Sequence, residues 1–312
     1  MKSISSKKLA IVALVVASVV SGVNTPIARF GLQSIPTSLF GLLRHAIPFI
    51  LLGIFLLLRP RKSLRKKEIL TAVVFGVLVY VAANGLFYLG VQRSGSINAA
   101  IIFLLDPLLM FLVSVEVMKE KFSPRVFAGI IIAFVGSIFV VFGPMLLADD
   151  LSFTGSAVGN IFLFGCVLAG IIGTWVAKIG VKKTDQIQFL FWSLAPAVVV
   201  YGFLSIGQLS QLPKIAQQPE LVYAVLFGAV FNGLLVYWCM FYGLKRVKGE
   251  EYGLFSYLAP ASAALVAVIF FNEKFTPALL AGVAVIATGL YLAEAHRVKV
   301  HHSHVHSLFK AK

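Results

Sequence analysis

The sequence predicts an all-α integral membrane protein with ten transmembrane helices in two inverted five-helix repeats. Three observations support this fold class: an apolar composition, ten apolar segments of membrane-spanning length, and an internal repeat displaced by 153 residues. Of the 312 residues, 59% are hydrophobic and 12% are charged, and the mean hydropathy is +0.95. Soluble domains carry about 25% charged residues. The composition therefore excludes a soluble globular enzyme, a disordered chain and a disulfide scaffold.

Ten segments are long enough to cross a bilayer, which takes about 20 mainly apolar residues. The first five are expected at Leu9–Ala28, Thr37–Leu58, Ile69–Val91, Ile97–Met118 and Val126–Ala148. The second five are expected at Leu151–Ala177, Ile187–Gly207, Leu221–Leu244, Tyr252–Phe271 and Phe275–Ala293. The first segment is longer than the apolar region of a signal peptide, so we interpret it as a retained helix. The segments are also too long and too uniformly apolar for the strands of a membrane barrel.

The net charge of +15 reflects the predicted membrane topology. With the N-terminus inside, 22 of the 27 Lys and Arg residues lie in inside segments and four in outside segments, while Arg44 lies within a span. This asymmetry follows the positive-inside rule. It predicts a multi-pass protein of the cytoplasmic (inner) membrane with both termini in the cytoplasm, and no nucleic-acid partner. The two cysteines, Cys166 and Cys239, lie in apolar runs and form neither a disulfide framework nor a metal motif.

An internal repeat relates the two halves of the chain. After a shift of 153 residues, 14 of the 47 positions between Gly90 and Gly136 are identical, and the matches include prolines, glycines and a Glu-Lys pair. The predicted organisation is a first repeat at 1–148, a second at 149–297 and a cytoplasmic His- and Lys-containing tail at 298–312. We interpret the tail as a solvated segment, with metal binding as the alternative. Because each repeat has an odd number of spans, the second must enter the membrane from the opposite side, as in inverted-repeat transporters.

Several short motifs follow one another along the chain. They are Ser21-Gly22-Val23-Asn24 with Arg44 twenty positions after Asn24, Asp106-Pro107, Lys119-Glu120-Lys121, Trp175 with Lys182-Lys183, and Pro260 with Glu273-Lys274. With these motifs the sequence resembles the EamA-type family of the drug/metabolite transporter superfamily over nearly its whole length. His45, where the family usually has an aromatic residue, and the His-rich tail depart from the family pattern. The resemblance implies a ten-helix basket whose central cavity is lined mainly by the first, third, fourth, sixth, eighth and ninth helices.

The resemblance also implies a function. It predicts a secondary active transporter, an exporter or exchanger, for small polar or amphipathic metabolites such as amino acids or nucleobases. The alternatives are a broad-specificity multidrug or toxic-compound exporter, a channel, or a non-transporting membrane receptor. The sequence contains no nucleophile–base pair, metal-ligand spacing or Walker motif, so we expect no enzymatic activity, catalytic residues, metal, cofactor or ATP drive. The expected partners are a small-molecule substrate and the lipid bilayer, with the chain a monomer or a homodimer.

Polar and aromatic side chains inside the spans are the candidate substrate-binding residues, because polar groups are costly in hydrocarbon. The set is Asn24, Arg44, Tyr80, Asn84, Tyr88, Asp106, Asn160, Trp175, Asn232, Tyr237, Trp238 and Tyr257. Gly76, Tyr80, Asn84 and Tyr88 share one face of the third span at i+4 spacing. That face either lines the cavity or bonds to another helix. Some of the aromatic residues are expected to belong to the interfacial belt.

The ionisable residues within the spans allow two interpretations each. Arg44 either faces the cavity and holds an anionic group or Asp106, or is a structural residue that snorkels toward the interface. Asp106 either binds a cationic group or a proton, or caps a helix that restarts at Pro107. His45 either couples transport to protons or packs between helices. Pro107 and its repeat equivalent Pro260 are expected to kink their helices.

Overall fold

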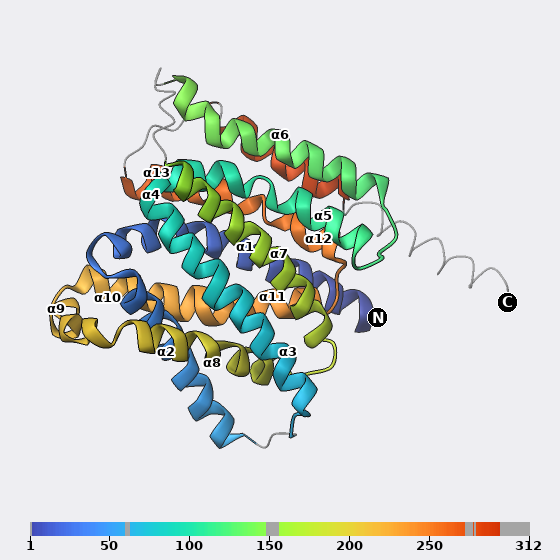
Figure 1. Cartoon of the computed structure of the whole chain (residues 1–312). Helices are drawn as coiled ribbons and strands as arrows, with labels where there is room; N and C mark the ends of the chain where they lie inside the picture. Colours follow the sequence, from blue (N-terminus) through green and yellow to red (C-terminus); the bar gives the residue numbers. More distant parts are fainter. Residues whose placement is uncertain (1, 60–62, 148–155, 272–276, 278, 294–312) are drawn as a thin grey trace.

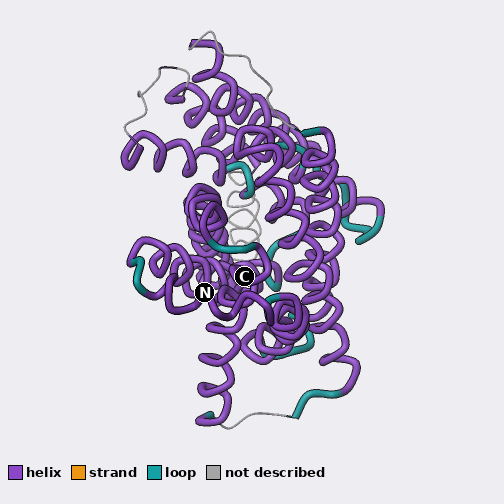
Figure 2. Tube along the Cα trace, turned by 60° about the vertical axis from the view of Figure 1, so that its left-hand side comes forward, coloured by secondary structure: helices purple, strands orange, loops and turns teal. Residues whose placement is uncertain are grey.

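A computed structural model of the chain describes residues 2–59, 63–147, 156–271, 277 and 279–293. Every element in these ranges is helical (Figures 1 and 2). The α-helices are α1 (Lys2–Ser34), α2 (Thr37–Leu58), α3 (Lys66–Gly76), α4 (Asn84–Phe103), α5 (Asp106–Glu116), α6 (Pro124–Leu147), α7 (Ala157–Gly180), α8 (Gln186–Leu204), α9 (Leu212–Ala216), α10 (Pro219–Leu226), α11 (Tyr237–Leu244), α12 (Gly249–Phe255) and α13 (Leu258–Phe271). A further apolar helix follows at Leu279–Ala293. The π-helical segments η1 (Val77–Ala83) and η3 (Phe227–Val236) join neighbouring α-helices, and η2 (Ile206–Gln211) is a short 3-10 helix.

Eight helical segments in the described part of the chain are long and apolar enough to cross a membrane. They run from Ser6–Ser34 to Pro219–Leu244 and correspond to the first eight expected spans. The ninth expected span is divided between α12 and α13, and the tenth is represented by the 15-residue helix Leu279–Ala293. Large apolar side chains such as Leu58 (82% exposed) and Phe203 (75% exposed) point outward, as expected of helices that face lipid.

The expected spans leave a loop at residues 92–96, between the third and the fourth span, and this prediction is wrong. The backbone is helical without a break from Lys66 to Phe103, through the Gln-Arg-Ser-Gly-Ser segment at 92–96. The break comes later, at Leu104–Leu105, because Pro107 has no backbone N–H to bond the carbonyl of Phe103. The same interruption separates α12 from α13, at Ser256–Tyr257, shortly before Pro260.

The two π-helical segments also lie at equivalent places in the two halves. A shift of 153 residues carries η1 onto residues 230–236, which lie inside η3. A π-helical turn adds a residue to the helix and is common at functional sites. Each segment here is followed directly by a candidate binding residue, Asn84 after η1 and Tyr237 after η3.

Two apolar clusters form most of the core. The larger one draws on helices of both halves, including α2, α3, α4, α7, α8 and α11, and contains Phe75, Tyr80, Phe189 and Phe241. The smaller one joins α5 and α6 to α12 and to helix 279–293. Glycines let some of these helices approach closely: a Cβ at Gly76 in α3 would overlap the backbone carbonyl of Ser193 in α8.

Helix α6 and helix 279–293 lie side by side (Figure 1). They contact each other through two pairs of glycines. A Cβ on Gly129 would lie 2.7 Å from the carbonyl oxygen of Gly289, and a Cβ on Gly136 would lie 2.8 Å from that of Gly282. The residue numbers rise along one helix as they fall along the other, so the pair is antiparallel. Gly282 and Gly289 are the residues that lie 153 positions after Gly129 and Gly136. Gly129 therefore contacts the repeat equivalent of Gly136, and Gly136 contacts the repeat equivalent of Gly129.

Because of this close contact, a methyl group added at one of these glycines is expected to lower the stability of the protein. Gly282→Ala is expected to destabilise the protein by about 1–3 kcal/mol, because the Cβ would lie 2.7 Å from the Gly136 carbonyl oxygen. Gly170→Ala in α7 is the matched control, since a Cβ there has nothing within 4 Å and Ala favours the helix. Melting temperatures of the purified variants in detergent test the difference. Equal melting temperatures for the two variants would show that the glycine pairs are not tight contacts.

Candidate functional site

Arg44 in α2 lies at the centre of a buried polar cluster. Its side chain is 4% exposed. One terminal nitrogen donates to the Tyr88 hydroxyl in α4 at 3.0 Å, and the other donates to the side-chain carbonyl of Asn232 in η3. The guanidinium also lies 5.8 Å from the centre of the Tyr88 ring. The cluster therefore joins the N-terminal half of the chain to the C-terminal half through the Arg44–Asn232 contact.

His45, the next residue, is held on both ring nitrogens. Nδ1 lies 2.7 Å from the backbone oxygen of Gly41, which can only accept, so Nδ1 carries the proton. Nε2 lies 3.2 Å from the side-chain nitrogen of Asn84 and accepts from it. The ring stacks on Tyr201 of α8 at 5.6 Å between centroids. Both nitrogens of a neutral imidazole are satisfied, which favours the packing interpretation of His45 over proton coupling.

Aromatic rings surround the arginine. Tyr80 and Tyr237 meet edge to face at 4.7 Å between centroids, and both pack against Phe75. The Tyr201 hydroxyl donates to the backbone oxygens of Tyr80 and Val81 in η1, at 3.1 and 3.2 Å. These contacts give the π-helical segment partners for two of its carbonyl groups. They also hold in place the backbone that carries the Tyr80 side chain.

Asp106 belongs to a second polar group, around the break between α4 and α5. It does not cap α5, since Leu105 is the cap residue and no side chain bonds there. Its carboxylate forms a hydrogen bond with Ser256, next to Tyr257. The Tyr257 hydroxyl donates to the backbone oxygen of Leu104 at 3.3 Å, and these two residues are 153 positions apart. This group, like the first, joins the two halves of the chain.

Two side chains connect the groups. Tyr252 of α12 interacts electrostatically with both Asp106 and Tyr237, and it forms a hydrogen bond with Thr174. The Cys166 thiol of α7 lies near Asp106, Tyr88 and Tyr237. Tyr252 and Cys166 thus link the Asp106 group to the aromatic residues around Arg44.

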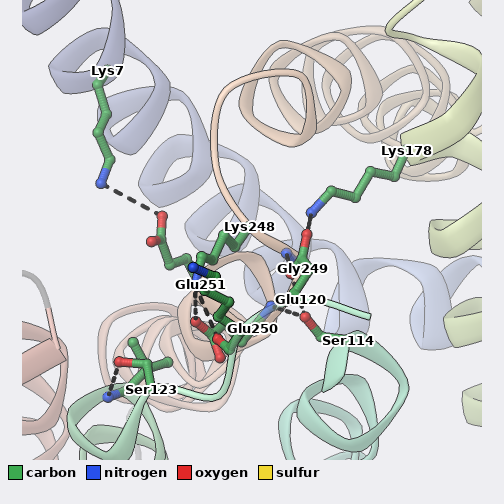
Figure 3. A network of polar contacts seen from close by, with 11 residues as sticks. Lys7, Ser114, Glu120, Ser123, Lys178, Lys248, Gly249, Glu250 and Glu251 are labelled. Atoms are coloured by element: carbon green, nitrogen blue, oxygen red, sulfur yellow. Dashed lines mark hydrogen bonds and ion pairs between the residues drawn. The ribbon is translucent and has the colours of Figure 1, made fainter. Parts of the chain in front are cut away.

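A separate ion-pair network lies where the ends of α1, α5, α7 and α12 meet (Figure 3). Glu120 is at its centre: its carboxylate accepts from the Lys178 ammonium, from the Ser114 hydroxyl and from the backbone N–H of Gly249. Lys7 of α1 pairs with Glu251 at 3.6 Å. Lys248 pairs with Glu250 at 3.2 Å and donates to the backbone oxygen of Lys121. We call this set the basic-end network.

The network holds charges in largely buried positions. The side chains of Lys178 and Glu120 are 7% and 16% exposed. Burial alone would raise the pKa of the Glu120 carboxyl, but the hydrogen bonds from Lys178, Ser114 and Gly249 outweigh it and hold that pKa below its ordinary value. Burial raises the pKa of Glu250, and the bond from Lys248 offsets only part of that effect. Glu120 is therefore the anion around which the network is organised.

Four candidate residues have no described contact with the two polar groups. Trp238 in α11 is 41% exposed and stacks on Tyr242, as a residue of the interfacial belt would. Trp175 in α7 is partly buried. Asn24 in α1 is buried and Asn160 in α7 is partly buried, and the side-chain oxygen of each has no hydrogen-bond partner among the described residues. The structure brings together the other eight candidates with His45.

Sequence reasoning missed several members of these clusters. Tyr201 lies in a span that also contains Gln188 and Ser193, and its signal was a polar hydroxyl within a membrane segment. Tyr252 and Cys166 carried no pattern that set them apart from packing residues. The sequence presents Glu120 only as part of a short motif and Lys178 only as a charge outside the spans, because nothing in it shows that the ends of α5 and α7 meet.

The chain is similar to known proteins in both sequence and fold. The model of the EamA-like transporter family matches residues 8–142 and 157–294, one match in each half. The uncharacterised transporter YyaM of Bacillus subtilis (strain 168) is 26% identical over 212 residues, which cover 66% of this chain and 67% of that protein. YetK of the same organism, also named an uncharacterised transporter, is 23% identical over 91% of this chain and 86% of its own length. A solved crystal structure aligns with a TM-score of 0.72 at 17% identity, over 93% of this chain and 98% of that one, and shows the same fold.

Proposed function

Because the chain belongs to the EamA-like transporter family, we propose that it is a secondary active transporter of small polar or amphipathic metabolites. Amino acids and nucleobases are the proposed range of substrates, and export or exchange is the proposed direction. The transporter works by alternating access between two inverted repeats, each with five membrane spans. Its substrate lies between Arg44 and Asp106, where both polar groups join one repeat to the other.

The observation that carries this proposal is the packing of α6 against helix 279–293. Gly129 contacts Gly289, the repeat equivalent of Gly136, and Gly136 contacts Gly282, the repeat equivalent of Gly129, and the helices are antiparallel. A reciprocal contact of this kind is the mark of a two-fold axis. For antiparallel helices that cross a bilayer, such an axis lies in the membrane plane. That is the symmetry of inverted repeats. The contact between Tyr257 and its equivalent Leu104 places both residues near the same axis.

The orientation follows from the charges. We propose that the basic end, where Lys7, Lys178 and Lys248 gather, faces the cytoplasm across an inner membrane. The basic-end network connects α5 of the first repeat to α7 and α12 of the second, so it closes the cytoplasmic side in this conformation. Positions 249–251, Gly-Glu-Glu, correspond to Ser-Ile-Asn at 96–98 one repeat earlier. The opposite end thus lacks the two acidic residues of the network, and the two gates differ in chemistry.

Asp106 is the proposed coupling site. It is the acidic residue at the break between two half-helices, a position at which transporters bind ions and protons. An intramembrane carboxylate that can gain a proton neutralises its charge and changes the cost of reorienting the site. His45 holds the Asn84 side chain in place instead.

Counterflow in proteoliposomes tests the function. Vesicles loaded with an unlabelled amino acid or nucleobase mixture are expected to take up the matching labelled compound above its equilibrium level for a limited time. Saturable counterflow supports a carrier. Flux without saturation or counterflow would identify a channel, counterflow with many unrelated dyes and amines would identify a multidrug exporter, and binding without flux would identify a receptor.

A further inference from the structure

Arg44 is a buried cation without a protein counter-ion. Its two hydrogen-bond partners, Tyr88 and Asn232, are neutral. Within the described part of the chain, no carboxylate lies at ion-pair distance from it, and Asp106 interacts with Ser256 instead. Arg44 is the eighth residue of α2, about 10 Å along the helix at 1.5 Å per residue, well away from the end of the span. A charge at that depth is expensive unless an opposite charge approaches it.

The donors around Arg44 outnumber the acceptors. A guanidinium has five N–H donors, and Arg44 donates two hydrogen bonds. The Tyr80 hydroxyl is fully buried, has no hydrogen-bond partner among the described residues and interacts electrostatically with Arg44. A buried hydroxyl without a partner costs free energy until an acceptor arrives. An anion would satisfy both the positive charge of Arg44 and the unpaired Tyr80 hydroxyl.

We propose that Arg44 and Tyr80 form a subsite for the carboxylate group of the transported solute. Two parallel N–H groups of the guanidinium fit the two oxygens of a planar carboxylate, and the Tyr80 hydroxyl supplies a third donor. The single positive charge favours a monoanion, because a doubly charged phosphate would bring an uncompensated charge into the membrane. This inference rests on the proposed transport function, since the ligand is the solute that is carried.

Binding in detergent tests the subsite without any transport. The probes are benzoate and 3-phenylpropionate, each compared with its own uncharged amide. The wild type is expected to bind each carboxylate more tightly than its amide. Arg44→Gln is expected to weaken carboxylate binding by about 10-fold to 100-fold and to leave amide binding unchanged. A loss of this size is typical when one hydrogen bond between charged groups is removed. Arg44→Lys and Tyr80→Phe are expected to give smaller losses, and they keep the test usable if Arg44→Gln does not fold.

Arg59→Gln is the matched control, because Arg59 follows the same helix and is exposed. It is expected to bind both probes as the wild type does. Equal binding of carboxylate and amide by the wild type would overturn the proposal, and so would carboxylate binding that survives in Arg44→Gln and Arg44→Lys. Loss of counterflow with intact carboxylate discrimination would instead contradict transport and keep the subsite. Counterflow without carboxylate discrimination would remove the subsite and keep transport.

Discussion

Lys178→Met is expected to destabilise the protein by about 3 kcal/mol, because it leaves the buried Glu120 carboxylate without its cation. Lys182→Met is the matched control: Lys182 is exposed at the same end of the chain, and the expected change is below about 0.5 kcal/mol. The double variant Lys178→Met/Glu120→Gln is expected to recover most of the loss, because it removes both charges. Melting in detergent measures all four proteins. A Lys178→Met variant as stable as Lys182→Met would show that the ion pair does not hold the two repeats together.

The pH dependence of the same interaction has a definite sign. Because the native pKa of Glu120 lies below its ordinary value, the stabilisation is complete above about pH 4.3, the ordinary glutamate pKa. It is lost as the pH falls through the lower native pKa. The stability difference between wild type and Glu120→Gln is therefore expected to stay constant from pH 8 to pH 5. A difference that fades between pH 8 and pH 6 would contradict the assignment.

Asp106→Asn is expected to abolish accumulation of substrate driven by a proton gradient, while counterflow continues. The amide keeps the size and the hydrogen bond to Ser256 but can no longer gain and lose a proton. Uptake with and without an imposed pH gradient, next to counterflow in the same vesicles, separates the two effects. Glu116→Gln, an exposed residue at the end of the same helix, is the control and is expected to leave both activities unchanged. Unchanged gradient-driven accumulation by Asp106→Asn would exclude it as the coupling site.

The sequence predicted the all-helical membrane fold, the two repeats and the eight helices that are long enough to span a membrane, because spans and repeats leave strong one-dimensional signals. A run of about 20 apolar residues has few structural alternatives, and repeated Pro, Gly and Glu-Lys positions are rare matches by chance. The 92–96 segment shows the limit of this reasoning. Its polar residues favour a loop, yet a helix satisfies its own backbone groups and continues through them.

The candidate site was predicted in part for a similar reason. The i+4 spacing placed Tyr80, Asn84 and Tyr88 on one face, and the structure brings that face to Arg44. Contacts between helices far apart in the chain carry no such periodic signal. Nothing in the sequence shows that Asn232 meets Arg44 or that Lys178 meets Glu120, because each contact depends on how the two repeats pack.

Alternating access is most directly tested by the distances between spin labels at the two ends of the molecule. One pair, at Lys121 and Lys182, spans the basic-end network between the first and second repeats, and the other, at Ser34 and Gln217, spans the opposite end. Substrate binding and release are expected to change the two distances in opposite directions, one widening as the other narrows. Adding Lys178→Met is expected to shift the first pair toward the wider distance without substrate. Two distances that stay constant, or that widen together, would contradict rocking of inverted repeats about a central site.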